Sequence, residues 1–226
     1  MSIIPEIQQI AMKLTLPNLG RGRIDLSAEK EENLEFLFRI LKAEQEKRDQ
    51  LKEAKRKQES RLPKKEYRTD GLNSGLAWQI EQLEKMDWVN DSQNLFLIGS
   101  CGTGKTSLAS FLGNKAIENG FKVSYTSIDS FIWTVLNKEK ERKLNGRYQY
   151  WLSSDLIIID DFLYTRLTDE ELIVLYKATM LFNETRSLMI ISNRSIPEWK
   201  DDHNDAHLVN TLIDRLTANS QTIHLK

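Results

Sequence analysis

Apolar and polar residues alternate along this chain in two different ways, and the change comes near residue 65. Before it, apolar positions recur every three or four residues, as in the stripe from Leu34 to Leu41, which is the period of a helix. After it, short apolar runs take turns with helical patterns, which indicates parallel strands joined by crossover helices. We therefore expect a helical N-terminal region over residues 1–65 and an α/β domain over residues 66–226.

The pattern also predicts the individual elements. Helices are expected over 3–14, from about Ser27 to Arg61, and over about 74–87 after a turn at Asp70-Gly71. In the α/β domain the expected strands are 95–99, 121–126, 155–160, 187–192 and 221–225. The helices expected between them are 105–118, 128–137, 168–183 and 206–216.

The stretch between the first expected strand and its helix carries the strongest chemical signal. Residues Gly99 to Thr106 fit G-x-x-x-x-G-K-[ST], the phosphate-binding loop, in the strand-turn-helix context that the pattern requires. A glycine-rich turn without a ligand is the alternative, and that context disfavours it. Lys105 is expected to reach the β/γ-phosphates of a nucleoside triphosphate, and the Thr106 hydroxyl to bind Mg²⁺. The predicted nucleotide contacts are Gly99, Ser100, Cys101, Gly102, Thr103, Gly104, Lys105, Thr106 and Ser107.

Two carboxylates, Asp160 and Asp161, follow the apolar run of strand 155–160. At the carboxyl end of a parallel strand they would lie beside the phosphate loop, where open α/β sheets bind ligands. Asp160 then fits the role of holding Mg²⁺ through water, and Asp161 that of orienting and deprotonating an attacking water. The alternative is a turn or helix cap, which aspartate often supplies.

Two further residues fit a site for phosphoryl transfer. Asn193 follows strand 187–192 and would face the γ-phosphate if that strand neighbours strand 155–160; a simple Ser-Asn turn is the alternative. Arg215 lies late on the helix over 206–216, where it either pairs with Asp214 or solvent, or supplies positive charge to the site of another subunit.

Composition narrows the class of protein. The chain has 226 residues, of which 40% are hydrophobic and 29% charged, so it is expected to be globular. We find no long apolar run and no secretory signal pattern, and therefore expect a cytoplasmic protein without a membrane anchor. The single cysteine, Cys101, excludes an internal disulfide and a cysteine-rich zinc site.

The net charge of −1 hides a basic stretch, because residues 42–68 carry 11 Lys/Arg against 6 Asp/Glu. One interpretation is a solvated helix laced with ion pairs, and the other is a surface that contacts DNA phosphates. The residues alone leave both open.

The motifs GSCGTGKTSLA (99–109), DLIIIDDF (155–162), IISNRSIPEW (190–199) and D-x₈-DRL (205–216) occur in this order. Together they resemble the IstB family of ATP-binding helper proteins in insertion-sequence transposition, and the related DnaC-type helicase loaders, both of which are AAA+ ATPases. The resemblance covers the whole chain, including a basic E-x-x-x-R segment at 44–48.

The resemblance implies a five-stranded parallel AAA+ sheet and hydrolysis of ATP with Mg²⁺. It places Lys105 and Thr106 on Walker A, Asp160 and Asp161 on Walker B, Asn193 on the first sensor position and Arg215 on an arginine finger that acts across a subunit boundary. Family members assemble on duplex DNA as homo-oligomers, in a ring or helix, and regulate a transposase. The DNA contacts that this favours are Lys47, Arg48, Lys52, Lys55, Arg56 and Lys57, with Lys140 and Lys143 as a second group.

The chain departs from the family pattern at three places. Thr217 and Ala218 stand where histidines are usual after DRL, and Cys101 replaces a proline or alanine. The sequence ends at Lys226, before the segment that usually supplies a second sensor arginine. A loader of a replicative helicase remains the alternative function. A small-molecule kinase is disfavoured because no segment between the strands looks like a lid or a substrate pocket.

Overall fold

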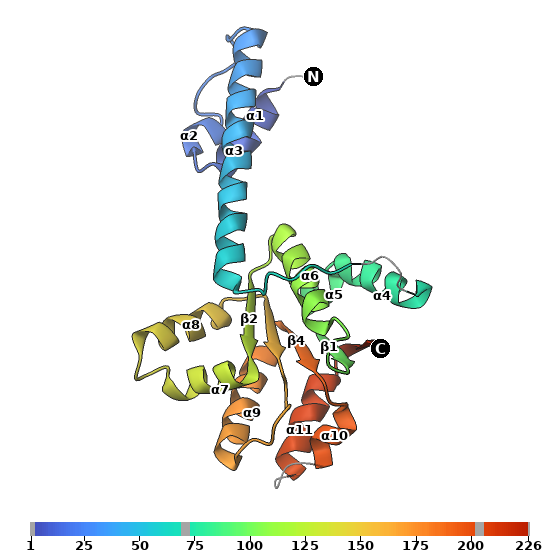
Figure 1. Cartoon of the computed structure of the whole chain (residues 1–226). Helices are drawn as coiled ribbons and strands as arrows, with labels where there is room; N and C mark the ends of the chain where they lie inside the picture. Colours follow the sequence, from blue (N-terminus) through green and yellow to red (C-terminus); the bar gives the residue numbers. More distant parts are fainter. Residues whose placement is uncertain (1–2, 69–72, 202–205, 226) are drawn as a thin grey trace. The chain divides into compact units, whose positions relative to one another are not determined.

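The computed structural model describes residues 3–68, 73–201 and 206–225. The chain forms two compact units, residues 1–55 and 56–226, and each is considered by itself. Figure 1 shows the order of the elements. The expected turn at Asp70-Gly71 and the Asp205 of the last motif lie outside the described residues.

The N-terminal unit is helical, as its apolar period predicts. It contains α1 (Ile4–Lys13), α2 (Pro17–Gly20) and most of α3 (Glu31–Ser60). Its small core joins α1 to the first half of α3, and consists of Ile7, Leu14, Leu26, Leu34 and Leu41 with partly buried neighbours. Beyond Leu41 the side chains of α3 in this unit are mostly exposed, so packing within the unit explains only the first part of this helix.

The second unit is an α/β fold. Its strands are β1 (Asn94–Gly99), β2 (Val123–Ser127), β3 (Leu156–Asp160), β4 (Ser187–Ser192) and β5 (Ser220–Leu225). Its helices, apart from the end of α3, are α4 (Ser74–Glu84), α5 (Asp87–Asn90), α6 (Lys105–Glu118), α7 (Ile128–Asn137), α8 (Arg142–Leu152), α9 (Asp169–Asn183), α10 (Ile196–Asp201) and α11 (Ala206–Thr217).

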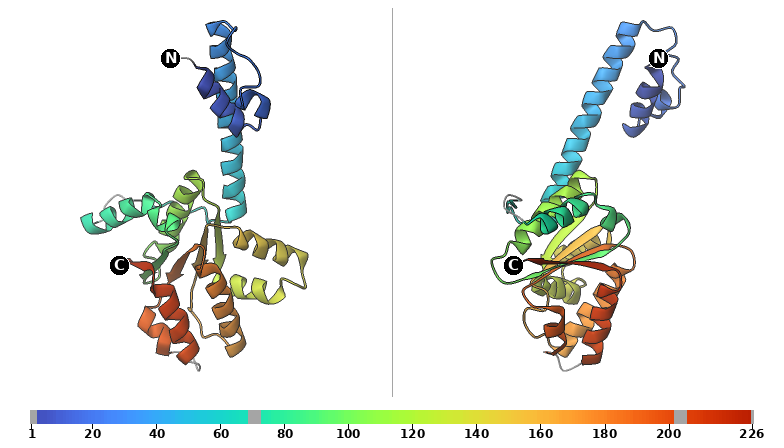
Figure 2. Two further views of the ribbon diagram at one scale, coloured as in Figure 1. Left: turned by 180° about the vertical axis from the view of Figure 1, so that it is seen from behind. Right: turned by 90° about the vertical axis from the view of Figure 1, so that its right-hand side faces the viewer.

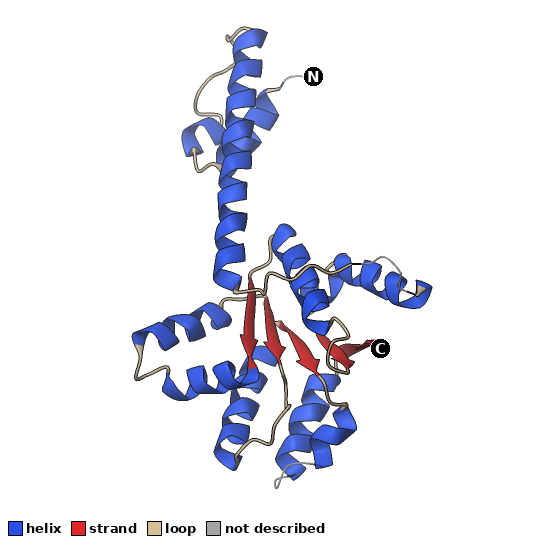
Figure 3. Ribbon diagram, viewed as in Figure 1, coloured by secondary structure: helices blue, strands red, loops and turns tan. Residues whose placement is uncertain are grey.

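All four strand pairs are parallel, and the sheet has the order β2-β3-β4-β1-β5. This confirms the expected five-stranded parallel sheet, shown in red in Figure 3. Alternate residues of the buried strands enter two separate cores. Leu95, Leu97 and Ile158 pack with α4, α5 and α6 on one face. Phe96, Ile157 and Ile159 pack with α7 to α11 on the other. The result is a three-layer arrangement, seen along the sheet in Figure 2.

Several predicted boundaries were displaced for identifiable reasons. The helix expected from Ser27 begins at Glu31, because the Ser27 amide and hydroxyl both donate to the Asp25 carboxylate and form a turn. The helix expected over 74–87 ends at Glu84, and Met86 adopts a left-handed conformation with φ of 61° before α5. The strand expected at 121 begins at Val123, because the Phe121 amide still bonds the Ala116 carbonyl at the end of α6.

Four helices were missed: the four-residue helices α2 and α5, and the longer α8 and α10. The polar face of α8 hides its period, because Trp151 is its one fully buried residue, stacked on Phe131 at 5.0 Å between ring centroids. Helix α10 is too short for a periodic signal, yet Trp199 within it is buried against Phe96 and Phe162. In the described ranges no helix combines the length and hydropathy that crossing a bilayer requires.

Candidate nucleotide site

The strand order brings the sequence-predicted residues to one edge of the sheet. β3 lies beside β4, and β4 beside β1, so the carboxyl ends of these three strands are adjacent. The phosphate loop leaves β1, Asp160 is the last residue of β3 with Asp161 directly after it, and Asn193 follows β4. In an open parallel sheet this edge is the usual place for a ligand.

The glycines of the loop have different structural roles. Gly102 and Gly104 have φ of +83° and +88°, which residues with a Cβ rarely adopt. Gly99 is not in this region; a Cβ there would lie 2.1 Å from the carbonyl oxygen of Leu225 on β5. Gly99 is therefore needed for close packing against β5, and the positive φ values of the other two shape the turn.

Lys105, the first residue of α6, is buried at the base of the loop. Its ammonium donates to the carbonyl oxygens of Gly99 at 2.8 Å and Ser100 at 2.6 Å. Burial lowers the pKa of Lys105, while Cys101 and the two aspartates oppose that shift. Together with the amides at the start of α6, this places positive charge where an anion would bind.

Thr106 and Asp160 are in direct contact, although 54 residues separate them in the sequence. The Thr106 hydroxyl donates to Oδ2 of Asp160 at 3.0 Å, and Oδ1 of Asp160 accepts the amide of Asp161 at 2.8 Å. The two carboxylates therefore lie on the same side of the sheet as the phosphate loop.

Asp161 occupies an unusual backbone position. Its φ is +57°, in the left-handed region that aspartate and asparagine tolerate better than most residues. Desolvation raises the pKa of the Asp161 carboxyl; repulsion from Asp160 and Asp129 adds to the rise, and Lys105 and Lys65 oppose it. A carboxylate with a raised pKa beside a phosphate-binding loop is suited to accept a proton.

These residues surround a cavity of about 370 Å³. Its lining residues are Lys65, Cys101, Gly102, Gly104, Lys105, Thr106, Ser107, Asp160, Asp161 and Asn193. The predicted contacts Gly99, Ser100 and Thr103 belong to the loop but do not line the cavity. Lys105 contacts Gly99 and Ser100, and the Thr103 hydroxyl donates to the Ser100 carbonyl at 3.0 Å.

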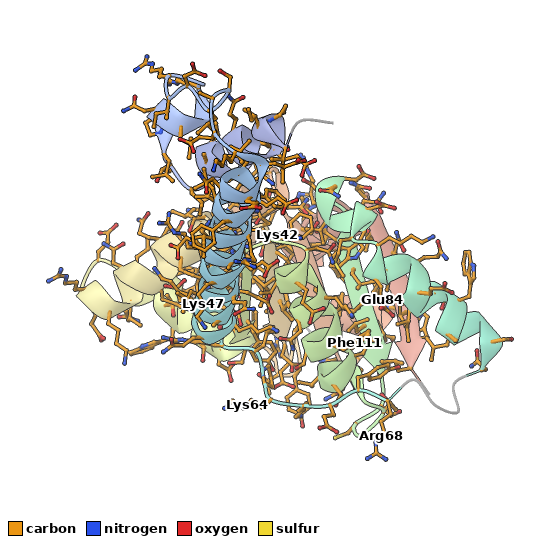
Figure 4. The ribbon with its side chains drawn as sticks, turned by 90° about the horizontal axis from the view of Figure 1, so that it is seen from above. Lys42, Lys47, Lys64, Arg68, Glu84 and Phe111 are labelled. Carbon is orange, nitrogen blue, oxygen red and sulfur yellow. The ribbon has the colours of Figure 1, made fainter. Side chains whose placement is uncertain are left out.

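Sequence reasoning missed Lys65, which lies on the segment between α3 and α4. This segment passes along α6, where the ring of Tyr67 lies 5.9 Å from that of Phe111; Figure 4 labels Lys64 and Arg68 on the segment and Phe111 on α6. Leu62, on the same segment, packs against Gly113 of α6, and a Cβ added at Gly113 would lie 2.8 Å from the Leu62 side chain. The segment has no motif, so only the fold reveals that it borders the site.

Arg215 is not part of this cavity. It is exposed in the last turn of α11, and the Asn183 side chain donates to its backbone carbonyl at 3.4 Å. Asn193, by contrast, lines the cavity as the order of β3 and β4 predicts.

The proposed DNA contacts fall into two groups. The first lies on α3, where ion pairs of the kind expected for a solvated helix are present. Arg48 pairs with Glu44 at 2.6 Å and also donates to the carbonyl of Leu14, while Lys52 lies 3.6 Å from Asp49. Figure 4 labels Lys42 and Lys47 on this helix.

In the last turns of α3, the Lys57 ammonium lies 3.8 Å from Glu118 of α6. Lys55 and Arg56 precede it on the same helix. The second group, Lys140 and Lys143, lies at the turn into α8 and in its first turn. The geometry alone leaves both interpretations of the basic residues open.

The oxygen atoms at this edge are suitable for a hard divalent cation. Mg²⁺ prefers a few protein oxygens, completed by water and substrate phosphates, to a cage made only of protein ligands. The Thr106 hydroxyl and the Asp160 carboxylate, in contact at 3.0 Å, provide such a partial set next to the phosphate loop.

Comparisons with known proteins agree with this geometry. The family model described as "IstB-like ATP binding protein" matches residues 10–226. A protein of Bacteroides fragilis, named for ATP binding in an IS21-like insertion sequence, is 29% identical over 231 residues, which cover 97% of this chain and 87% of that protein.

Solved structures share the fold. A crystal structure of the DnaC helicase loader matches with a TM-score of 0.60 at 17% identity, covering 71% of this chain and 94% of the other. AMPPCP-bound DnaA from Aquifex aeolicus matches with a TM-score of 0.54 at 21% identity, covering 69% of this chain and 48% of DnaA. At these identities the likeness establishes the fold alone.

Proposed function

Because the chain belongs to the IstB-like ATP-binding proteins and has the fold of the AAA+ ATPases, we propose that it hydrolyses ATP and uses the cycle to assist DNA transposition. In this proposal the protein forms a homo-oligomer on duplex DNA in the cytoplasm and regulates a transposase. The observation that carries the ATPase part is the contact between Thr106 and Asp160 beside the phosphate loop, in a cavity that Asp161 and Asn193 also line.

Each residue of the site has a role in this reaction. Thr106 and Asp160 would hold Mg²⁺, which when bound neutralises charge on the β- and γ-phosphates. Lys105 would exchange its bonds to the loop carbonyls for bonds to phosphate oxygens. Asp161 would accept the proton of the attacking water, and Asn193 would orient that water or contact the γ-phosphate.

Replacing Lys105 by alanine tests this site. We expect Lys105→Ala to lose ATP binding and turnover, because it removes the cation at the base of the loop. Lys115→Ala is a matched control, since Lys115 lies on the same helix and its ion pair with Glu118 at 3.3 Å is exposed. Intact ATP turnover in Lys105→Ala would show that the site is wrongly assigned.

The position of Arg215 supports a role between subunits. It is exposed and does not line the cavity of its own chain, as a residue that acts on the site of a neighbouring copy would be. In a mixture of Arg215→Ala and Asp161→Ala protomers, some interfaces combine an intact finger with an intact base, and we expect part of the hydrolysis to return. A mixture as inactive as its parents would argue against the finger.

The DNA part rests on the basic residues of α3 and on the insertion-sequence name of the relative in Bacteroides fragilis. We expect binding to duplex DNA to weaken with salt, and the dependence to become shallower when Lys47, Lys52 and Lys55 are replaced by glutamine. Arg48 is left in place because its guanidinium also donates a hydrogen bond to the backbone carbonyl of Leu14. The control replaces Lys13 on α1, Lys177 on α9 and Lys85, the residue that follows α4. DNA affinity that does not respond to salt would remove this part of the proposal.

A loader of a replicative helicase is the alternative function, and the fold that the chain shares with DnaC is compatible with it. The two functions differ in the partner. We expect the ATP-bound protein on DNA to retain the transposase encoded by an adjacent reading frame, and not a replicative helicase. Retention of the helicase alone would favour the loader.

A further inference from the structure

Tyr125, on the edge strand β2, lies near Asp160, and no motif includes it. The parallel register pairs Tyr125 with Ile158 and Ser127 with Asp160. Because side chains alternate along a strand, Tyr125 points to the same face as Val123, the face that α6 and the phosphate loop cover. A tyrosine is long enough to reach two positions along the neighbouring strand.

The Tyr125 hydroxyl makes that contact. It donates to Oδ2 of Asp160 at 2.5 Å, and the same oxygen accepts the Thr106 hydroxyl at 3.0 Å. With the Asp161 amide on Oδ1, three donors hold the carboxylate from three elements of the chain: β2, α6 and the turn after β3. Hydrogen bonds to a charged acceptor are among the stronger ones in proteins.

Tyr125 is itself fixed at its backbone. The guanidinium of Arg147, on α8, donates to the Tyr125 carbonyl at 2.6 Å and to the Glu59 carbonyl at 3.0 Å. The rings of Tyr150 and Trp151 lie 5.5 Å and 5.7 Å from the same guanidinium. The hydroxyl therefore approaches Asp160 from a backbone position that a second side chain holds.

We infer that Tyr125 is a positioning residue for the magnesium ion of this site: its hydroxyl holds the Asp160 carboxylate beside Thr106. This inference rests on the proposed ATPase function, because it concerns the cation that accompanies ATP. Tyr125 itself does not contact the nucleotide in this proposal. Its removal therefore weakens the response to Mg²⁺ and leaves the grip of the phosphate loop on ATP unchanged.

The test measures binding of a fluorescent ATP analogue, mant-ATP, in EDTA and across a Mg²⁺ titration. For Tyr125→Phe we expect unchanged affinity in EDTA and a rise of about tenfold or more in the Mg²⁺ concentration at half-saturation, as for other residues that orient a metal ligand. Tyr150→Phe is the matched control. It removes a partly buried hydroxyl that bonds the carbonyl of Val123 at 3.2 Å, on the same strand but away from Asp160.

A second comparison separates positioning from general damage. If Tyr125 acts through Asp160, Tyr125→Phe adds nothing to the Mg²⁺ response of Asp160→Asn. An unchanged Mg²⁺ midpoint in Tyr125→Phe, an equal loss in EDTA and in Mg²⁺, or a full additional loss on the Asp160→Asn background would each overturn the inference. Failure of the unmodified protein to bind mant-ATP would instead refute the proposed function, and that result is visible before any variant is made.

Discussion

Replacing Asp161 by asparagine or alanine separates two properties of this residue, its carboxylate and its backbone. Asparagine keeps the size of the side chain and tolerates the left-handed conformation that Asp161 adopts at φ +57°. Alanine removes the carboxylate too, but is strained at that φ by about 1 kcal/mol. The two variants should therefore show the same loss of ATP turnover and differ in thermal stability.

The expected magnitudes follow from these roles. A positioned general base contributes about 10²–10⁴-fold to a rate, so both variants should lose turnover by that factor. ATP affinity should be unchanged or higher, because a negative charge is removed beside the phosphates. For a chain of this size, 1 kcal/mol lowers Tm by about 2–4 °C, and only Asp161→Ala should show this decrease.

The assay compares phosphate release with binding of mant-ATP and with thermal unfolding. Asp129→Asn is the control, because Asp129 is a neighbouring carboxylate that raises the pKa of Asp161 but does not line the cavity. Its turnover should stay within a few-fold of the unmodified protein. The assignment of Asp161 as the base is refuted if Asp161→Asn retains more than a tenth of the turnover while binding ATP normally.

Two further outcomes are expected. Turnover should fall as the pH drops through the raised pKa of Asp161. Because the Lys65 ammonium lowers that pKa, Lys65→Ala should move this acidic limb of the pH profile to higher pH. A limb that does not move would argue against Asp161 as the titrating base. Asn94→Ala should destabilise the second unit by about 2–5 kcal/mol in chemical denaturation. The substitution removes the buried hydrogen bonds of the Asn94 side chain to the Leu188 amide, at 3.0 Å, and to the Leu216 carbonyl, at 2.9 Å. The exposed Asn119→Ala should change stability by less than about 0.5 kcal/mol.

How closely the sequence predicted each helix and strand depended on where its side chains pack. The strands around Leu97 and Ile158 are buried on both faces, so their continuous apolar runs could be recognised and the parallel sheet inferred. Helix α9 was expected over 168–183 and spans Asp169–Asn183; a capping box between Thr168 and Glu171 fixes its start. Helix α8 was not predicted, because Trp151 is its one fully buried residue and its other contacts, such as those of Arg147, are with residues distant in the sequence.

The same distinction applies to the site. The phosphate loop and the two aspartates at the end of β3 have local sequence patterns, and the adjacent strand ends bring them together. Lys65 and Tyr125 have no local pattern, because each reaches the site through the packing of a different segment. Arg215 could be identified only by resemblance, and its exposed position agrees with either a solvent contact or a neighbouring subunit.

The close approach of Gly99 to the Leu225 carbonyl has a practical consequence for engineering this protein. β5 pairs with β1 along its whole length, from Asn94 opposite Ser220 to Gly99 opposite Leu225. A deletion or insertion that displaces Leu225 would therefore disturb the first residue of the phosphate loop, although the two residues are far apart in the sequence. Insertions are better placed outside this strand pair, and a Gly99 variant with poor nucleotide binding should first be checked for a loosened contact between β1 and β5.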